Sequence, residues 1–162
     1  MSLRLGVGLA LALLVVLIDQ LTKACVSHVL DYGEQVPVLS VLSWILVHND
    51  GAAFSFLGNE SGWQRWLLAG LASGFSIYLL VEMTRASGWW SGCALALVLG
   101  GAIGNLIDRL TLGYVVDFVL VHWQTHYFPA FNVADAAISV GAVGWICDMF
   151  VAGRTESSRG FA

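Results

Sequence analysis

Charged residues are scarce in this chain. Only 7 Lys and Arg and 11 Asp and Glu occur among 162 residues, whereas hydrophobic residues make up 58%. That is more apolar surface than one small soluble core can bury. Basic residues form no cluster and the net charge is only −4, which argues against a nucleic-acid partner. The composition excludes an ordinary soluble domain and indicates an integral membrane protein.

Cysteine is also rare. Cys25, Cys93 and Cys147 lie in or beside different apolar stretches, and no two of them have a paired spacing. We therefore expect no disulfide framework, and we interpret the cysteines as small buried hydrophobic residues.

Four apolar stretches have about the 20 residues that a helix needs to cross a bilayer. They are residues 5–24, 63–83, 92–112 and 133–152. Four crossings place both termini on the same side of the membrane. Basic residues accumulate in short cytoplasmic segments, and on the side of the termini lie Arg4, Arg85, Arg154 and Arg159. We predict an all-α membrane protein with cytoplasmic termini.

Three basic residues do not follow this distribution. Lys23, Arg65 and Arg109 lie within the predicted helices or at their outer ends, so we interpret them as site or anchor residues. We predict one membrane domain over residues 1–153. Residues 154–162, which are rich in Ser, Gly and Arg, should form a disordered cytoplasmic tail.

The first stretch has some features of a cleaved leader. Residues 1–4 form a short basic start, and residues 21–25 faintly resemble a lipoprotein cleavage box. A leader, however, has an uninterrupted apolar region, and Asp19 and Lys23 interrupt this one. We therefore expect a membrane helix here rather than the signal of a lipoprotein precursor.

Two segments, residues 26–62 and 113–132, should lie outside the membrane on the far side from the termini. In the first, the β-prone runs 35–47 and 52–57 flank Asn49-Asp50-Gly51, a turn sequence typical of hairpins. We predict a small sheet here. Its aromatic residues Trp44, Phe54 and Phe56 would favour the outer membrane surface, where the sheet would cover the outer ends of the helices.

Two acids border the apolar stretches at this outer boundary. Asp117 follows the third predicted helix and Asp135 lies in the first turn of the fourth. Ionisable groups at membrane depth are costly and usually serve a function. Two neighbouring carboxylates share one proton, which suits acid–base hydrolysis of a peptide bond. Taken singly, Asp135 could instead stabilise a helix N-terminus, and Asp117 could be an ordinary loop acid.

Other polar residues recur at helical spacing near the same boundary. The pairs are Asp19 with Lys23, Asn105 with Arg109, and Asn132 with Asp135. Asp19, Lys23 and Asp108 suit a buried structural brace. Arg109, Asn105 and Asn132 could hydrogen-bond the backbone of a bound peptide, which needs partners for its amides in lipid.

Five blocks of sequence resemble the lipoprotein signal peptidase family, also called signal peptidase II. In order they are Asp19-Gln20-Leu21-Thr22-Lys23, Asn49-Asp50-Gly51-Ala52-Ala53-Phe54, Gly100-Gly101-Ala102-Ile103-Gly104-Asn105-Leu106-Ile107-Asp108-Arg109, Val116-Asp117-Phe118 and Phe131-Asn132-Val133-Ala134-Asp135. Any one block alone would be weak evidence, but five in the expected order are specific. One departure is His48, where many relatives have Tyr.

The resemblance implies an aspartic endopeptidase of the bacterial inner membrane. It would remove signal peptides from diacylglyceryl-modified prolipoproteins, cutting just before the lipidated cysteine at the periplasmic boundary. The implied catalytic residues are Asp117 and Asp135. Substrate-binding and inhibitor-binding positions fall on Asn49, Gly51, Asn105, Arg109 and Asn132, and supporting positions fall on Asp19, Lys23 and Asp108. The family is blocked by cyclic depsipeptides such as globomycin. We expect a monomer without metal or cofactor.

Other chemistries fit less well. His122 and His126 have the spacing of a zinc-protease helix, but Trp123 stands where the activating Glu is required. A Ser/Lys mechanism through Lys23 would need one of three serines, none of which lies in a motif: Ser27, Ser55 and Ser61. A small transporter would distribute its acids through the membrane depth or contain an inverted repeat, and neither is visible.

Overall fold

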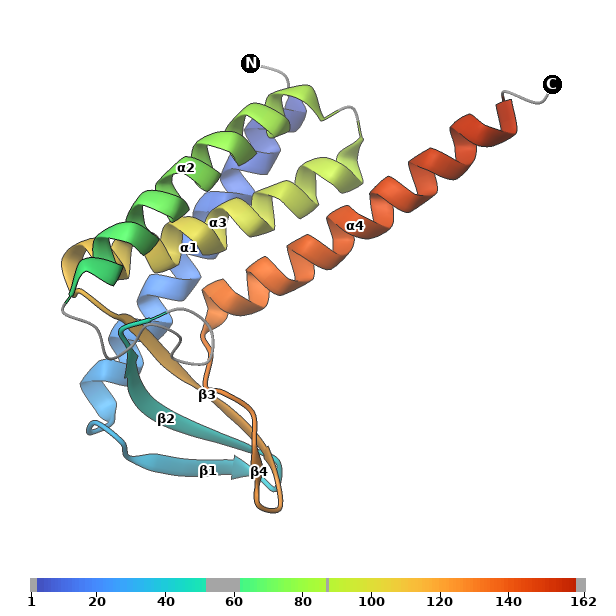
Figure 1. The fold of residues 1–162 in the computed structure, drawn as a ribbon. Coiled ribbons are helices and arrows are strands. Elements are labelled where there is room, and N and C mark those ends of the chain that lie inside the picture. The colour runs from blue at the N-terminus through green and yellow to red at the C-terminus, as the bar shows by residue number, and fades with distance from the viewer. Residues whose placement is uncertain (1–2, 52–61, 87, 160–162) are drawn as a thin grey trace.

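The computed structural model describes residues 3–51, 62–86 and 88–159. Its elements follow in the order α1 (Leu3–Val29), β1 (Gln35–Leu39), β2 (Leu42–Asn49), α2 (Trp63–Arg85), α3 (Trp89–Thr111), β3 (Val115–Trp123), β4 (His126–Tyr127) and α4 (Val133–Arg159). The helices run side by side, and the strands lie together beyond one end of them (Figure 1). The start of α1 and the end of α4 both lie at the opposite end of the helices, away from the sheet.

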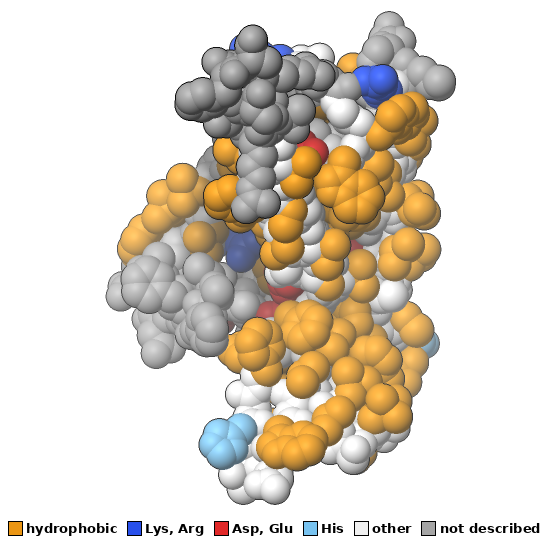
Figure 2. Space-filling model, turned by 90° about the vertical axis from the view of Figure 1, so that its right-hand side faces the viewer, with side chains coloured by type: hydrophobic (Ala, Val, Ile, Leu, Met, Phe, Trp, Pro, Cys, Tyr) orange, Lys and Arg blue, Asp and Glu red, His pale blue; other side chains and the backbone are white. Residues whose placement is uncertain are grey.

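Four helices of the described chain are long and apolar enough to cross a membrane, as predicted. Each predicted span overlaps one of them. Large hydrophobic side chains cover their outer surfaces (Figure 2), because lipid rather than a protein core solvates these faces. Cys25 and Cys147 lie on such exposed faces, so the prediction that the cysteines are buried is wrong for these two.

The last helix is longer than the sequence analysis predicts. Its predicted end is residue 152, followed by the tail 154–162, whereas the helical backbone of α4 continues to Arg159. Residues 153–159 contain no proline, so nothing in them removes a backbone donor from the helical hydrogen-bond ladder.

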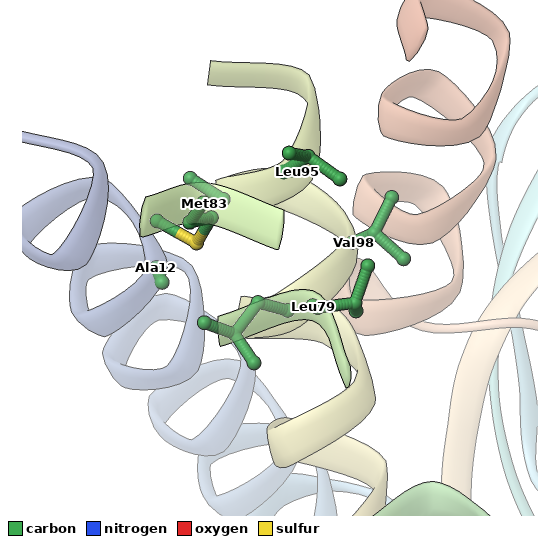
Figure 3. Packing of buried hydrophobic residues seen from close by; sticks show 7 residues of the cluster. Ala12, Leu79, Met83, Leu95 and Val98 are labelled. Atoms are coloured by element: carbon green, nitrogen blue, oxygen red, sulfur yellow. The ribbon is translucent and has the colours of Figure 1, made fainter. Parts of the chain in front are cut away.

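Helix α3 is the centre of the bundle and contacts the other three helices. Its buried Leu95, Val98 and Leu99 belong to one hydrophobic cluster with Leu79 and Met83 of α2 (Figure 3). Glycines bring the other two helices close. A Cβ at Gly100 would lie 2.7 Å from the Ala12 carbonyl oxygen of α1, and a Cβ at Gly101 would overlap the Ala134 carbonyl oxygen of α4. Small residues allow this approach where the bilayer supplies no hydrophobic driving force.

The sheet has the order β1-β2-β3-β4, with antiparallel neighbours. The run 35–47 is not one strand, because it turns between Leu39 and Leu42, which pair with each other. On the side away from β1, strand β2 pairs with β3, which comes from the second outer segment. The predicted second arm, residues 52–57 with Phe54 and Phe56, lies outside the described residues. Trp44 of β2 packs on Phe118 and remains 38% exposed.

Candidate active site

Asp117 lies on β3, opposite Val47 of β2. Residues 115–118 of this strand are all buried, and Asp117 itself is 2% exposed. Two carboxamides satisfy its carboxylate. Asn49 Nδ2 donates to Oδ2 at 3.0 Å and Asn132 Nδ2 donates to Oδ1 at 2.7 Å. Asp117 is therefore not an ordinary loop acid but a buried, oriented carboxylate.

Burial is the main cause that raises the pKa of Asp117 to about 7, from an ordinary value of 3.8. The negative charge of Asp135 raises it further, whereas the hydrogen bonds from Asn49 and Asn132 and the charge of Lys23 lower it. Desolvation and a like charge both disfavour the ionised form. Near neutral pH this carboxyl can therefore hold or release a proton.

Asp135 lies in the first turn of α4, as predicted. Its Oδ1 accepts from Asn105 Nδ2 at 2.8 Å, and its Oδ2 accepts from the backbone N–H of Asn132 at 3.2 Å. Asn132 Oδ1 in turn accepts from the backbone N–H of Asp135 at 2.9 Å. This reciprocal pair satisfies two backbone donors at the start of the helix.

Asn132 links the two carboxylates. Its backbone N–H donates to Asp135 and its side-chain Nδ2 donates to Asp117, with further contacts to Asn105 Oδ1 and to the Val116 carbonyl oxygen at 3.2 Å each. The residue is completely buried and does not line the adjacent cavity. Its observed contacts therefore orient the acids, whereas the sequence analysis assigns it to the substrate pocket.

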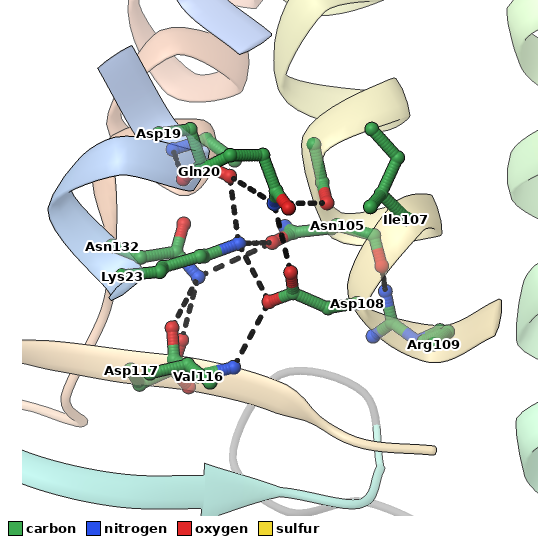
Figure 4. Close-up of polar contacts among 12 residues, drawn as sticks. Asp19, Gln20, Lys23, Asn105, Ile107, Asp108, Arg109, Val116, Asp117 and Asn132 are labelled. Atoms are coloured by element: carbon green, nitrogen blue, oxygen red, sulfur yellow. Dashed lines mark hydrogen bonds and ion pairs between the residues drawn. The ribbon is translucent and has the colours of Figure 1, made fainter. Parts of the chain in front are cut away.

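A buried charge cluster lies behind the acids (Figure 4). The ammonium of Lys23 is 2.8 Å from Asp19 Oδ2 and 2.8 Å from Asp108 Oδ2. Asp19 Oδ1 also accepts the N–H of Ala134 at 2.8 Å, and Asp108 Oδ2 accepts the N–H of Val116 at 3.1 Å. The cluster thus joins α1 and α3 to the backbone beside each acid.

Gln20 belongs to this cluster although the sequence analysis gives it no role. Its Nε2 donates to Asp108 Oδ1 at 2.8 Å, to the Gly104 carbonyl oxygen at 3.2 Å and to Asp19 Oδ2 at 3.3 Å. The signal in the sequence is a polar carboxamide next to Asp19 in an apolar stretch. A partly buried carboxamide still needs hydrogen-bond partners in the membrane, so Gln20 marks a contact with another helix.

Arg109 extends from α3 to the loop after β2. Its Nη2 donates to the Gly51 carbonyl oxygen at 3.1 Å and its Nη1 is 3.4 Å from the Asn105 carbonyl oxygen. The N–H of Gly51 donates to Asn49 Oδ1 at 3.1 Å, which orients the Asn49 carboxamide. Arg65 holds the end of α3 through the carbonyl oxygens of Arg109 and Leu110, at 2.6 and 2.7 Å. Arg65 thus anchors the end of α3, which is one of the two roles, site or anchor, that the sequence analysis leaves open.

A cavity of about 900 Å³ opens beside the acids. Asp117 and Asp135 both line it, together with Asn49, Asn105 and Arg109. Its other walls are mostly apolar and come from β2, β3, the segment 127–131 and α4; they include Ile45, Val47, Leu120, Phe128, Phe131, Ile138 and Val140. The apolar walls are not predicted by the sequence analysis. Gly51, a predicted pocket residue, does not line this cavity.

His48 also lines the cavity. Its ring stacks on Tyr114, with centroids 3.9 Å apart, and lies 4.9 Å from the Tyr32 ring. An aromatic stack therefore forms at the position where many relatives have Tyr.

The structure disfavours the competing chemistries. His122 is on β3 and His126 is on β4, so the two do not share a helix face. Among the described residues no group of His, Cys, Asp and Glu could hold a metal ion. Lys23 is ion-paired with two acids and does not contact Ser27 in any described hydrogen bond, while Ser55 and Ser61 lie outside the described residues.

Fold and site together define a membrane-embedded protein with two carboxylates facing one cavity. The family model described as Signal peptidase (SPase) II matches residues 11–151. Curated relatives named lipoprotein signal peptidase include one from Pseudomonas putida, 55% identical over 90% of this chain and 88% of the relative. Another, from Acinetobacter baylyi, is 49% identical over 94% of this chain and 87% of the relative.

A solved structure is also similar. It is titled a bacterial membrane enzyme, determined by the in meso method, and superposes with a TM-score of 0.81 at 28% identity, covering 90% of this chain and 88% of that one. The chain belongs to the signal peptidase II family. It is thus a membrane peptidase, of the aspartic type for which that family is known.

Proposed function

We propose that Asp117 and Asp135 are the catalytic dyad of this peptidase, and that it cleaves diacylglyceryl-modified prolipoproteins immediately before the lipidated cysteine. The observation that carries the proposal is that Asn132 hydrogen-bonds both carboxylates while both line one cavity. Because one asparagine contacts both acids and both line the same cavity, a single scissile peptide bond bound there could reach both carboxyl groups.

Peptide hydrolysis by this dyad requires one of the two carboxyl groups to be protonated and the other to be ionised. The ionised carboxylate removes a proton from water as the water oxygen attacks the scissile carbonyl carbon. The protonated carboxyl donates its proton to the carbonyl oxygen, giving a tetrahedral intermediate. Return of a proton to the leaving amine breaks the C–N bond. The raised pKa of Asp117, about 7, supports this exchange at neutral pH.

The cavity walls suit an extended peptide that carries a lipid. Asn49, Asn105 and Arg109 line the cavity near the acids and can hydrogen-bond the backbone amides of a substrate, which find no water in the bilayer. The apolar walls can contact acyl chains and the signal peptide. Cyclic depsipeptides such as globomycin would compete for the same cavity.

Membrane orientation is part of the proposal. Arg4 and Arg85 lie at the helix ends opposite the sheet, and basic residues favour the cytoplasmic side. The termini would then be cytoplasmic, and the sheet and dyad would be at the periplasmic surface of the inner membrane. Labelling of Ser40→Cys, in a variant whose three native cysteines are replaced by alanine, with an impermeant reagent in intact spheroplasts tests this orientation, because Ser40 is exposed in the turn between β1 and β2. Labelling of Ser40→Cys but not of Arg85→Cys is expected, and the reverse would contradict it.

A gel-shift assay with purified enzyme tests the substrate. The enzyme, expected to be a monomer in detergent, is mixed with a prolipoprotein that either carries the diacylglyceryl group or lacks it. Cleavage of the lipidated form only, blocked by globomycin, is expected. Equal cleavage of both forms would contradict the proposed lipid requirement. Proton flux without cleavage in liposomes would instead favour a transporter.

A further inference from the structure

Lys23 is too deep to meet a substrate. Its side chain is 4% exposed and it does not line the cavity. Besides its two ion pairs, its ammonium donates to Asn105 Oδ1 at 3.0 Å (Figure 4). An ammonium has three donors and no acceptor, so Asp19, Asp108 and Asn105 use its full hydrogen-bonding capacity.

The contact with Asn105 determines which way that carboxamide faces. Because Lys23 can only donate, Asn105 must present its oxygen to the ammonium. Asn132 Nδ2 donates to the same oxygen at 3.2 Å. The Asn105 nitrogen consequently points to the other side, where it donates to Asp135 Oδ1 at 2.8 Å. In the opposite orientation, an N–H would face the ammonium and an oxygen would face the carboxylate.

We propose that Lys23 is a positioning residue for catalysis, because it fixes the Asn105 carboxamide with its N–H donor on Asp135. The inference rests on the proposed function, which makes Asp135 a member of the dyad. Asp19 and Asp108 contribute by holding the ammonium in place. A buried cation thus orients a catalytic carboxylate through one intervening carboxamide, without contact between the cation and the reacting atoms.

A double-mutant cycle tests this chain of contacts. Lys23→Met, Asn105→Ala and the double variant are compared with wild type for cleavage of the lipidated prolipoprotein. Loss of an oriented donor to a charged group costs roughly tenfold or more in rate. We therefore expect Lys23→Met to lower kcat by about tenfold or more and to change KM by less than about twofold, because Lys23 is not in the cavity wall.

The central expectation is that the two substitutions are not independent. If Lys23 acts through Asn105, the double variant has the kcat of Asn105→Ala within about twofold. If the two losses multiply in the double variant, the inference is overturned. A Lys23→Met variant with raised KM and unchanged kcat would overturn it as well. The inference and the proposed function fail in different ways. If the wild-type enzyme cleaves normally but the losses multiply in the double variant, only the inference fails. If the wild-type enzyme does not cleave the lipidated prolipoprotein, the proposed function fails.

Two controls separate positioning from folding. Leu79→Ala removes a completely buried side chain from the hydrophobic core shared by α2 and α3 and none of the polar contacts of the site, so it should lower Tm and leave kcat within about twofold of wild type. A loss of kcat in Leu79→Ala equal to that in Lys23→Met would point to general loosening of the fold and overturn the inference. If Lys23→Met does not fold, the cycle is run in an Asp108→Asn background, where Lys23→Met leaves a single buried acid in the cluster.

Discussion

Asn132 and Asp135 cap each other at the start of α4. Asn132 Oδ1 accepts the backbone N–H of Asp135 at 2.9 Å, and Asp135 Oδ2 accepts the backbone N–H of Asn132 at 3.2 Å. The same asparagine donates to Asp117 through Nδ2 at 2.7 Å. One residue therefore caps the helix and contacts both carboxylates at the cavity, so helix stability and the proposed catalysis should depend on the same contacts.

Asn132→Ala should damage both properties. Loss of the cap costs about 1 kcal/mol of stability, and loss of an oriented donor at the dyad should lower kcat by about 100-fold. Thermal unfolding and cleavage kinetics measure the two effects. Thr22→Val is the control, because Thr22 bonds only backbone oxygens of its own helix. Normal kcat in Asn132→Ala would show that this residue does not orient the acids.

The pH dependence of cleavage should reflect Asp117. With its pKa raised to about 7, Asp117 holds a proton in the folded protein at pH values where the unfolded chain has lost it. Protonated Asp117 therefore stabilises the folded state, and this stabilisation is complete at pH values below the ordinary pKa of 3.8. It is lost as the pH rises through about 7, the pKa in the folded protein. Above that pH the pair also loses its shared proton, so kcat should decline on the alkaline side.

Asn49→Leu should move this alkaline decline to higher pH. The side-chain Nδ2 of Asn49 donates to Asp117 Oδ2 and lowers the pKa of Asp117, so its removal should raise that pKa further. Profiles of kcat against pH for wild type and variant provide the measurement. A decline that stays in place or moves to lower pH would contradict the assignment of the alkaline limb to Asp117.

Alanine substitutions at two glycines of α3 should have different effects on the free energy of unfolding. A Cβ at Gly101 would overlap the Ala134 carbonyl oxygen, whereas a Cβ at Gly92 would meet nothing within 4 Å. Gly101→Ala should cost roughly 1–3 kcal/mol through overpacking. Gly92→Ala should be neutral or stabilise by up to about 1 kcal/mol through helix propensity. Unfolding in detergent measures both, and equal stability of the two variants would argue against the observed α3–α4 contact.

The sequence predicts the helices well because a membrane span needs a long, continuous apolar run, as in residues 63–83. It also predicts that Asp117 and Asp135 lie at the same end of the bundle, since two successive spans bracket them. The sheet is predicted less well. Strand β3 is buried at four successive residues, so it has no alternating pattern, and its pairing with β2 joins segments distant in the chain.

The contacts within the site are harder still to predict. Residue types alone cannot distinguish a polar side chain that faces substrate from one that holds another side chain. Asn132 illustrates this, because it is predicted in the pocket but lies completely buried behind it. Gln20 is a second example, since its partners on α3 are more than 80 residues away in the chain.

The most direct test of the central claim is the cleavage rate of Asp117→Asn and Asp135→Asn, each measured with the lipidated prolipoprotein in single turnover. Both variants should be monodisperse in detergent with a cooperative unfolding transition. Each should lose about 1,000-fold or more in rate, because each removes one partner of the acid–base pair. A folded variant of either aspartate that cleaves within tenfold of the wild-type rate would contradict the dyad.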